Sequence, residues 1–386
     1  MPTKDRSTLF RGSRGSPIGT RNLAAAIFAA FILLALAAFQ GFSNEPVPGD
    51  RDNDVEALIR AGHWKRARAI VEPRVQAHPQ DAKSCYELAE VKFTFKDIDG
   101  ALPLAQHAVE LDPNNSNYHL QLGKVYGEQA ARASFISAGS LAVKFRKEVE
   151  VAIQLDSKNL DVLDAMMQFK FQAPGIMGGS KDEARELADK IAALNPSAGY
   201  LAHAELAELE KDPAQMEAFY LKAVQADAGN YDAVIALATF YSQSPHAKYD
   251  EAMKQSQSAM HLDPRRIGAY RVQARVFALQ QRWADLEQTL ASAEKNVPDD
   301  LRPYYEAAQG LLESGRGYAK AEGYVKKYLS QEPEGEEPDS ADAHRLLGLL
   351  FERERRNAEA RSEFHAALKL RRGFKAAKED LKNLND

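Results

Sequence analysis

Prolines recur along this chain at intervals close to 34 residues. Pro79 and Pro113 are 34 residues apart, Pro264 and Pro298 are again 34 apart, and Pro333 follows 35 residues later. Each proline closes a segment of the form Ala-x-x-x-(apolar)-x-x-Ala-x-x-x-x-Pro. A period of this length predicts a pair of helices that repeats along the chain. One such pair cannot bury its apolar stripe alone, so the pairs must stack in a row.

Nine units can be aligned on three shared features. These are an apolar and a small residue in a first helix, an alanine in a second helix, and then a proline or its equivalent. Unit two is the cleanest, with Leu88 and Ala89 in its first helix and Ala101, Ala105 and Ala108 in its second. Small residues let the two helices approach closely, and the apolar residues between them form a stripe that the next unit covers. The pattern therefore predicts an all-α solenoid.

This pattern resembles the tetratricopeptide repeat (TPR) family, of the exported bacterial type, over roughly residues 50–372. The phase holds over about nine units, although none carries the family's full Trp-Leu-Gly-Tyr-Ala-Phe-Ala-Pro set. The resemblance implies a right-handed superhelical solenoid of helix–turn–helix repeats whose first helices line a concave groove, the usual ligand face. The expected division is a basic region 1–22, an apolar segment 23–39, a linker 40–53, a repeat array 54–372 and a capping helix 373–386.

The N-terminal sequence predicts export. Basic side chains precede the apolar run 23–39, and a polar, acidic stretch follows it. This order is typical of a secretory signal peptide, whereas the length of 17 residues is at the lower edge for a transmembrane anchor. Positive charge before the run predicts that the repeats are translocated, so we expect them in the periplasm, either free or anchored to the inner membrane. The basic residues are Lys4, Arg6, Arg11, Arg14 and Arg21.

Composition and motifs argue against catalysis. The net charge of −5 disfavours a nucleic-acid partner. Cys85, the only cysteine, falls at a packing position and is expected to be a buried, inert thiol. No His-Glu-x-x-His or Gly-x-Ser-x-Gly motif occurs, and the Gly-rich stretch 175–181 lacks the order of a phosphate loop. Ser180 and Glu183 instead predict a helix cap. We expect no enzyme activity, no catalytic residue, no cofactor and no metal.

The aligned phase predicts which side chains point into the groove. Its middle is expected to be acidic and its C-terminal end basic. Arginines bind carboxylates in a bidentate manner, so the basic end is predicted to hold an acidic side chain or a free C-terminus. This is similar in kind to the family's carboxylate clamp, whose Lys/Asn set is not reproduced here. The alternative is that the arginines pair with neighbouring Asp and Glu. The acidic residues are Asp161, Asp164, Glu205 and Glu208; the candidate peptide-binding residues are Arg271, Arg275, Arg302, Tyr305, Gln309 and Arg345.

The period is interrupted at residues 130–142, at residues 173–184 and at the acidic stretch 332–340. The first insertion either lengthens two helices, lies over the groove or has no role. The expected function is a non-catalytic protein–protein interaction scaffold that binds a peptide or a helix in its groove. Membrane contact is expected only through the N-terminal segment. The alternatives are a self-assembling structural solenoid and an accessory subunit that presents substrates to an envelope enzyme.

Overall fold

The computed structural model describes residues 54–243, 245, 247–335 and 337–384, and these form helices and connecting turns without a strand. Pairs of antiparallel helices follow one another as the sequence period predicts, which confirms the helical repeat solenoid. The α-helices are α2 (Val55–Ala61), α3 (Trp64–Ala77), α4 (Ala82–Thr94), α5 (Ile98–Leu111), α6 (Ser116–Arg132), α7 (Phe135–Leu155), α8 (Leu160–Gln172), α9 (Lys181–Leu194), α10 (Pro196–Leu209), α11 (Pro213–Ala226), α12 (Tyr231–Ser242), α13 (Tyr249–Leu262), α14 (Gly268–Leu279), α15 (Trp283–Asn296), α16 (Arg302–Ser314), α17 (Tyr318–Tyr328), α18 (Ser340–Arg353), α19 (Asn357–Leu370) and α20 (Lys375–Asn383).

Short polar residues start the helices where the sequence period places them. Asn115, Asn159 and Asn230 each cap a first helix, with the side-chain oxygen accepting backbone N–H groups of the first turn. Such caps satisfy donors that have no partner within the helix. Ser180 caps α9 by accepting the Glu183 N–H at 3.2 Å, as predicted. The helix starts are therefore encoded locally, one unit at a time.

The structure shows what the first two interruptions of the period form. Ala133 and Ser134 alone separate α6 from α7, which has 21 residues, so the extra residues of unit three lengthen both helices. In unit four the insertion forms a short 3₁₀ helix, η1 (Gly175–Met177). The Arg146 guanidinium donates to the Met177 carbonyl oxygen at 3.3 Å and ties this turn to α7. Neither insertion interrupts the stacking of the units.

Small residues sit at the closest helix contacts. Ala108 is fully buried, and Cys85 is a buried thiol whose pKa is raised by burial, which agrees with the predicted packing positions. At Gly199 of α10 a Cβ atom would lie 2.2 Å from the Ala192 Cα atom of α9. At Gly323 of α17 a Cβ atom would meet no other atom within 4 Å.

These two glycines make a matched pair for stability measurements. Replacing Gly199 by alanine should lower the free energy of unfolding by about 2–3 kcal/mol, because backbone must move to admit the methyl group. Replacing Gly323 by alanine should raise it by about 0.5–1 kcal/mol, because alanine is the better helix former. Urea unfolding followed by circular dichroism measures both changes. Equal effects of the two substitutions would show that α9 and α10 do not pack as described.

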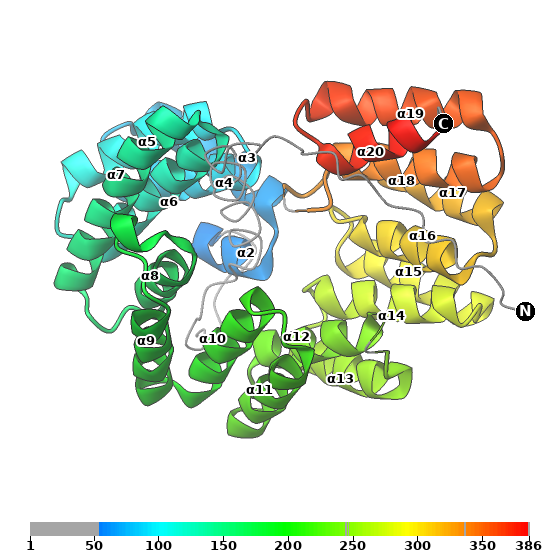
Figure 1. Cartoon of the computed structure of the whole chain (residues 1–386), viewed down its shortest axis with the longest axis horizontal. Helices are drawn as coiled ribbons and strands as arrows, with labels where there is room; N and C mark the ends of the chain where they lie inside the picture. Colours follow the sequence, from blue (N-terminus) through cyan, green and yellow to red (C-terminus); the bar gives the residue numbers. More distant parts are fainter. Residues whose placement is uncertain (1–53, 244, 246, 336, 385–386) are drawn as a thin grey trace, which may run out of the picture.

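The array curves until its first unit meets its last units. Figure 1 shows the helix pairs arranged around a centre, with α10 and α12 nearer to it than α11 and α13, and with α2 inside the curve. We call the surface made by α4 and the other first helices the inner face. Residues of α3 contact the loops after α15 and α17, more than 230 positions away in the sequence. The chain therefore forms a closed ring.

The N-terminal export or anchor segment lies outside the described residues. Among the helices that are described, none combines the length and the apolar character that a membrane span requires.

Candidate functional site

A cavity opens on the inner face where the C-terminal end of α2 meets α12, α14 and α16. Its volume is about 160 Å³, and four arginines line it: Arg266, Arg271, Arg275 and Arg302. Glu306 is the one carboxylate among the described lining residues. Ala61 and Gly62 line the cavity from the α2 side, so the first unit contributes a wall. We call this cavity the arginine pocket.

The sequence predicted three of the pocket's arginines. Arg271 and Arg275 lie one helical turn apart on α14, and both guanidinium groups reach Glu306, as expected for residues on one face. Arg302 is the first residue of α16 and lines the same cavity. The alignment of the repeat units was thus sufficient to predict that these three side chains lie near one another.

The other predicted residues lie elsewhere in the structure. Arg345 Nε lies 2.6 Å from Asp380 Oδ2, so it joins α18 to the last helix, α20. The Tyr305 ring packs on the Tyr328 ring with centroids 5.6 Å apart, and Gln309 is half-buried on α16. None of these three side chains is among the described residues that line the pocket.

The pocket arginines pair with acidic neighbours, the alternative that the sequence left open. Arg271 Nη2 lies 2.7 Å from Glu306 Oε1. Arg275 Nη2 lies 2.7 Å from both carboxylate oxygens of Glu313, and its Nε donates to the Ser242 carbonyl oxygen at 3.3 Å. Arg275 is only 7% exposed, so reversing its charge would bury a carboxylate beside Glu313. Arg275 is consequently a structural residue as well as a pocket residue.

The remaining two arginines are also held in place. Arg266 Nη2 lies 2.6 Å from Asp232 Oδ1, and its guanidinium stacks on the Tyr231 ring at 3.8 Å from the centroid. Arg302 binds Asp300 through Nε and Nη2 at distances between 2.6 and 3.1 Å. Arg271, whose side chain is 31% exposed, is the most accessible of the four.

Contacts across the ring closure hold α2 over the pocket. Lys65 donates its backbone N–H to Glu334 Oε1 at 2.8 Å and its ammonium to the Glu332 carbonyl oxygen at 2.8 Å. Arg68 pairs with the Glu332 carboxylate. Gly335 follows with φ +94°, where a Cβ atom would lie 3.1 Å from Thr94 at the end of α4. Residues 332–335 of the acidic stretch therefore dock on the first two units.

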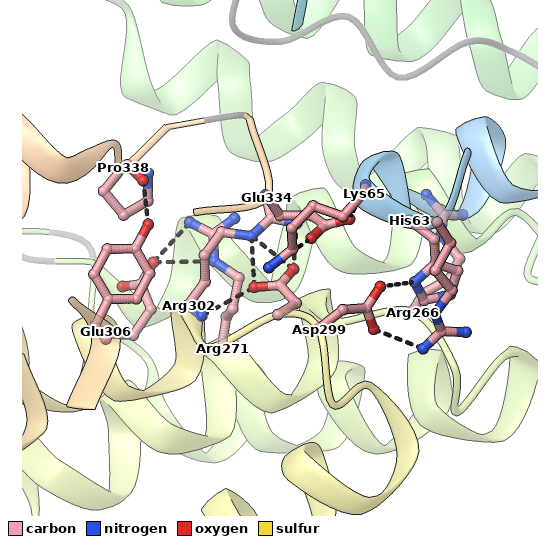
Figure 2. Close-up of polar contacts among 12 residues, drawn as sticks. His63, Lys65, Arg266, Arg271, Asp299, Arg302, Glu306, Glu334 and Pro338 are labelled. Carbon is pink, nitrogen blue, oxygen red and sulfur yellow. Dashed lines mark hydrogen bonds and ion pairs between the residues drawn. The ribbon is translucent and has the colours of Figure 1, made fainter. Parts of the chain in front are cut away.

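A second set of closure contacts centres on Asp299. Arg66 Nη2 lies 2.6 Å from Asp299 Oδ1, and His63 Nδ1 lies 3.7 Å from Oδ2. Figure 2 shows His63 and Lys65 approaching Asp299 and Glu334 beside Arg302 and Arg271. Burial alone would raise the pKa of Asp299, but the nearby His63 imidazole and the hydrogen bond and charge of Arg66 outweigh it and lower the pKa to about 2. Burial raises the pKa of Glu334 to about 7 against the opposing Lys65 N–H.

Sequence reasoning missed this closure. The signal was present as charge: the basic stretch His63 to Arg68 in unit one is complementary to the acidic stretch Glu332 to Glu337. The 34-residue period describes only contacts between neighbouring units, however, and it cannot pair segments at opposite ends of the array.

Opposite the arginine pocket, the inner face of α4, α6, α8 and α10 is acidic. Five carboxylates face one another there and form what we call the acidic wall: Glu90, Asp161, Asp164, Glu205 and Glu208. Burial raises the pKa of Glu90 to about 7 although the Lys124 ammonium opposes the shift. Burial also raises the pKa of Asp164 to about 7, and that of Glu205 well above its usual range. The sequence placed four of these five residues in the groove.

Comparison with known proteins bears on the fold. No protein-family model matches the sequence, and no curated protein is significantly similar to it. The crystal structure of yeast Tom70 is similar, with a TM-score of 0.50 and 14% identity over 86% of this chain and 80% of that chain. A thermophilic TPR protein of Thermus thermophilus has a TM-score of 0.43 and 17% identity, over 50% of this chain and 97% of its own. A tetratricopeptide repeat protein from Parabacteroides merdae has a TM-score of 0.42 and 15% identity, over 80% and 100%.

The 34-residue period, the helix pairs and the likeness to Tom70 agree. The chain is a TPR-like helical repeat protein. At this level of identity the likeness concerns the fold alone.

Proposed function

We propose that this protein is a non-catalytic scaffold that binds a peptide or a helix of a partner protein along its inner face. The arginine pocket holds an acidic side chain or a C-terminal carboxylate of that partner. The observation that carries the proposal is the cavity of about 160 Å³ that four arginines line, among them Arg271 with a side chain that is 31% exposed. A cavity of about 150 Å³ accommodates a benzene-sized group, so the pocket suits one side chain or chain terminus.

The charge of the pocket selects its ligand. Guanidinium groups bind carboxylates through paired, charge-assisted hydrogen bonds. The pairing of each arginine with an acid fixes its orientation before the ligand arrives, which lowers the entropic cost of binding. Arg271 is the side chain that a ligand reaches first, because it is the most exposed of the four. The pocket is therefore suited to a single carboxylate.

The site of action follows from the N-terminal sequence. A basic region and an apolar run precede the repeats, an order typical of exported or anchored proteins. We place the repeats on the extracytoplasmic side of a membrane, where they organise an envelope complex.

Peptide binding tests the proposal. The full-length protein in non-ionic detergent is titrated with a library of fluorescent peptides that lack basic residues, each made with a free C-terminus and as the C-terminal amide. We expect the free acids to bind about tenfold more tightly, the effect of about 1.4 kcal/mol from a charge-assisted hydrogen bond. Arg271→Gln should remove this preference, while Arg185→Gln on α9, which also breaks an arginine–carboxylate pair, should preserve it. Equal binding of acids and amides by all three proteins would refute the carboxylate pocket.

A further inference from the structure

The helix α20, which Figure 1 shows at the end of the array beside α19, carries a stripe of lysines on one face. Lys375, Lys378 and Lys382 follow one another at spacings of three and four residues, which places them on the same side of the helix. The opposite side packs against the last units, because Ala377 is fully buried and Leu381 contacts their apolar core. The packing therefore turns the three lysines outward, and each of them is exposed.

The turn before α20 extends this basic surface. α19 ends at Leu370, and the Phe374 N–H donates to the Arg371 carbonyl oxygen at 3.0 Å, so a tight turn leads directly into α20. Leu370 is 59% exposed, and the exposed cations Lys369 and Arg372 lie on either side of it in the sequence. We call this surface the basic end, and it consists of Lys369, Leu370, Arg372, Lys375, Lys378 and Lys382.

Ion pairs do not compensate the charge of the basic end. Six basic and two acidic residues fall between Lys369 and Lys382, a net charge of +4 in a chain whose net charge is −5. Two of these eight residues, Arg371 and Asp380, pair with residues in α18 or at its cap. None of the five cations of the basic end forms an ion pair with another described residue, whereas each of the three lysines of α17 pairs with a glutamate. Glu379 is the one exposed carboxylate of α20.

An anionic lipid surface fits the basic end better than a structured acidic site on a protein does. Lysine ammonium groups are point charges on flexible stems, and no paired carboxylate fixes their direction, in contrast to the arginines of the pocket. Lysine clusters on an amphipathic helix are typical of proteins that bind anionic headgroups. An exposed leucine beside them suits the boundary between the headgroups and the acyl chains. Phosphate groups spread over a plane also match cations that are spread over a turn and a helix.

We propose that the basic end binds the anionic headgroups of a phospholipid bilayer. The contact is peripheral, since no described helix has the length and apolar character of a membrane span. It adds a second membrane contact to the one expected from the N-terminal segment, and it holds the last unit of the ring against the bilayer. The arginine pocket takes no part in it, so this inference stands apart from the proposed function.

The test places a fluorophore on α20 and a quencher on the lipid headgroups. A cysteine introduced at the exposed Asn383 carries the fluorophore, and the buried Cys85 is replaced by alanine. The full-length protein is reconstituted into vesicles of phosphatidylcholine, or of equal parts phosphatidylcholine and phosphatidylglycerol, each with a quencher-labelled lipid. The apolar run 23–39 can enter either membrane, so the readout is the position of α20 and not the binding of the whole protein. We expect little quenching in the neutral vesicles and strong quenching in the anionic ones, which weakens as ionic strength rises.

Charge reversal on α20 should abolish the contact. The triple variant Lys375→Glu, Lys378→Glu, Lys382→Glu should lower the equilibrium constant for docking by about a hundredfold or more, because each lysine near an anionic surface contributes a factor of about five. The corresponding triple glutamine variant, which introduces no new charge, should lose most of the quenching as well. All three side chains are exposed, so both variants should fold, and circular dichroism checks it.

A matched control reverses three exposed lysines in other units that also lack ion pairs with described residues: Lys158, Lys190 and Lys254. This variant has the same net charge as the α20 variant and should be quenched like the wild type. Equal quenching in neutral and anionic vesicles, or equal losses in both charge-reversal variants, would overturn the proposal. Absence of quenching in both kinds of vesicle would also overturn it and would leave an acidic protein as the partner of the basic end.

Discussion

Replacing Arg302 by alanine should lower the free energy of unfolding by about 3–5 kcal/mol. Asp300 is 2% exposed and Arg302 3%, and their side chains meet at 2.6–3.1 Å. Removing the guanidinium leaves the Asp300 carboxylate buried without its cation, which is the costly way to break a buried ion pair. Urea unfolding at pH 7, followed by circular dichroism, measures the loss.

A double variant distinguishes the cost of leaving the Asp300 carboxylate unpaired from the cost of losing the packing of the Arg302 side chain. Arg302→Met with Asp300→Asn removes both charges but keeps an oxygen for the Arg302 backbone N–H, which Asp300 Oδ1 accepts at 2.9 Å. This variant should recover most of the stability, because replacing both partners is far cheaper than removing one. A loss below about 1 kcal/mol for Arg302→Ala would mean that Arg302 is exposed to solvent, and hence that α2 does not cover it.

Charge reversal on α3 should open the ring. The triple variant Lys65→Glu, Arg66→Glu, Arg68→Glu places three carboxylates opposite Asp299, Glu332 and Glu334. Polar contacts dominate the closure: the apolar cluster of the first units spans residues 55–104 and that of the last units 253–384. Helicity should therefore stay unchanged while the radius of gyration, measured by small-angle X-ray scattering, increases.

Two controls accompany the ring-opening variant. Reversal of Lys320, Lys326 and Lys327 on α17 changes the net charge equally and should leave the radius of gyration unchanged, because their partners lie in the same or the adjacent unit. Reversing Asp299, Glu332 and Glu334 as well should restore the closed form of the α3 variant. An α3 variant as compact as the wild type would show that these ion pairs do not close the ring.

The pKa values of Asp299 and Glu334 predict how the stability of the ring closure depends on pH. The lowered pKa of Asp299 means that its contribution is complete above its usual value of 3.8 and is lost as the pH falls toward 2. The raised pKa of Glu334 has the opposite sense: ionisation is disfavoured in the closed form, so its contribution is lost as the pH rises through about 7. The contribution of Glu334 is complete only below its ordinary value of 4.5, so the ring should be most firmly closed near pH 4 to 4.5 and should weaken progressively up to about pH 7.

Much of the fold was predictable because each unit repeats the same short-range sequence features. The Ala and Pro positions, the Asn caps and the phase of α14 all act over fewer than about 40 residues. That phase sufficed to place Arg271 and Arg275 together and Asp164 near Glu205. The helix pairs and half of the candidate site residues could therefore be predicted from the short-range period.

The remaining features depend on distances that a period does not encode. Arg345 was expected in the groove but contacts Asp380 of α20, because the last helix folds back on α18. Arg275 was expected to be accessible, but the bidentate Glu313 contact and the Ser242 carbonyl bury it. The closure joins Lys65 to Glu334, 269 residues apart, and so depends on the accumulated curvature of every unit between them.

The closure distance in the wild-type sequence tests the account most directly, because Ala61 and Gly62 form a wall of the arginine pocket only in the closed ring. Spin labels on cysteines introduced at Ala69 and Ser330, both exposed, report it by pulsed electron paramagnetic resonance. Cys85 is buried and is replaced by alanine. The closed ring predicts one short, narrow distance distribution at low salt that broadens as ionic strength rises. A long or broad distribution at low salt would show that the array is open and that the arginine pocket lacks the wall formed by Ala61 and Gly62.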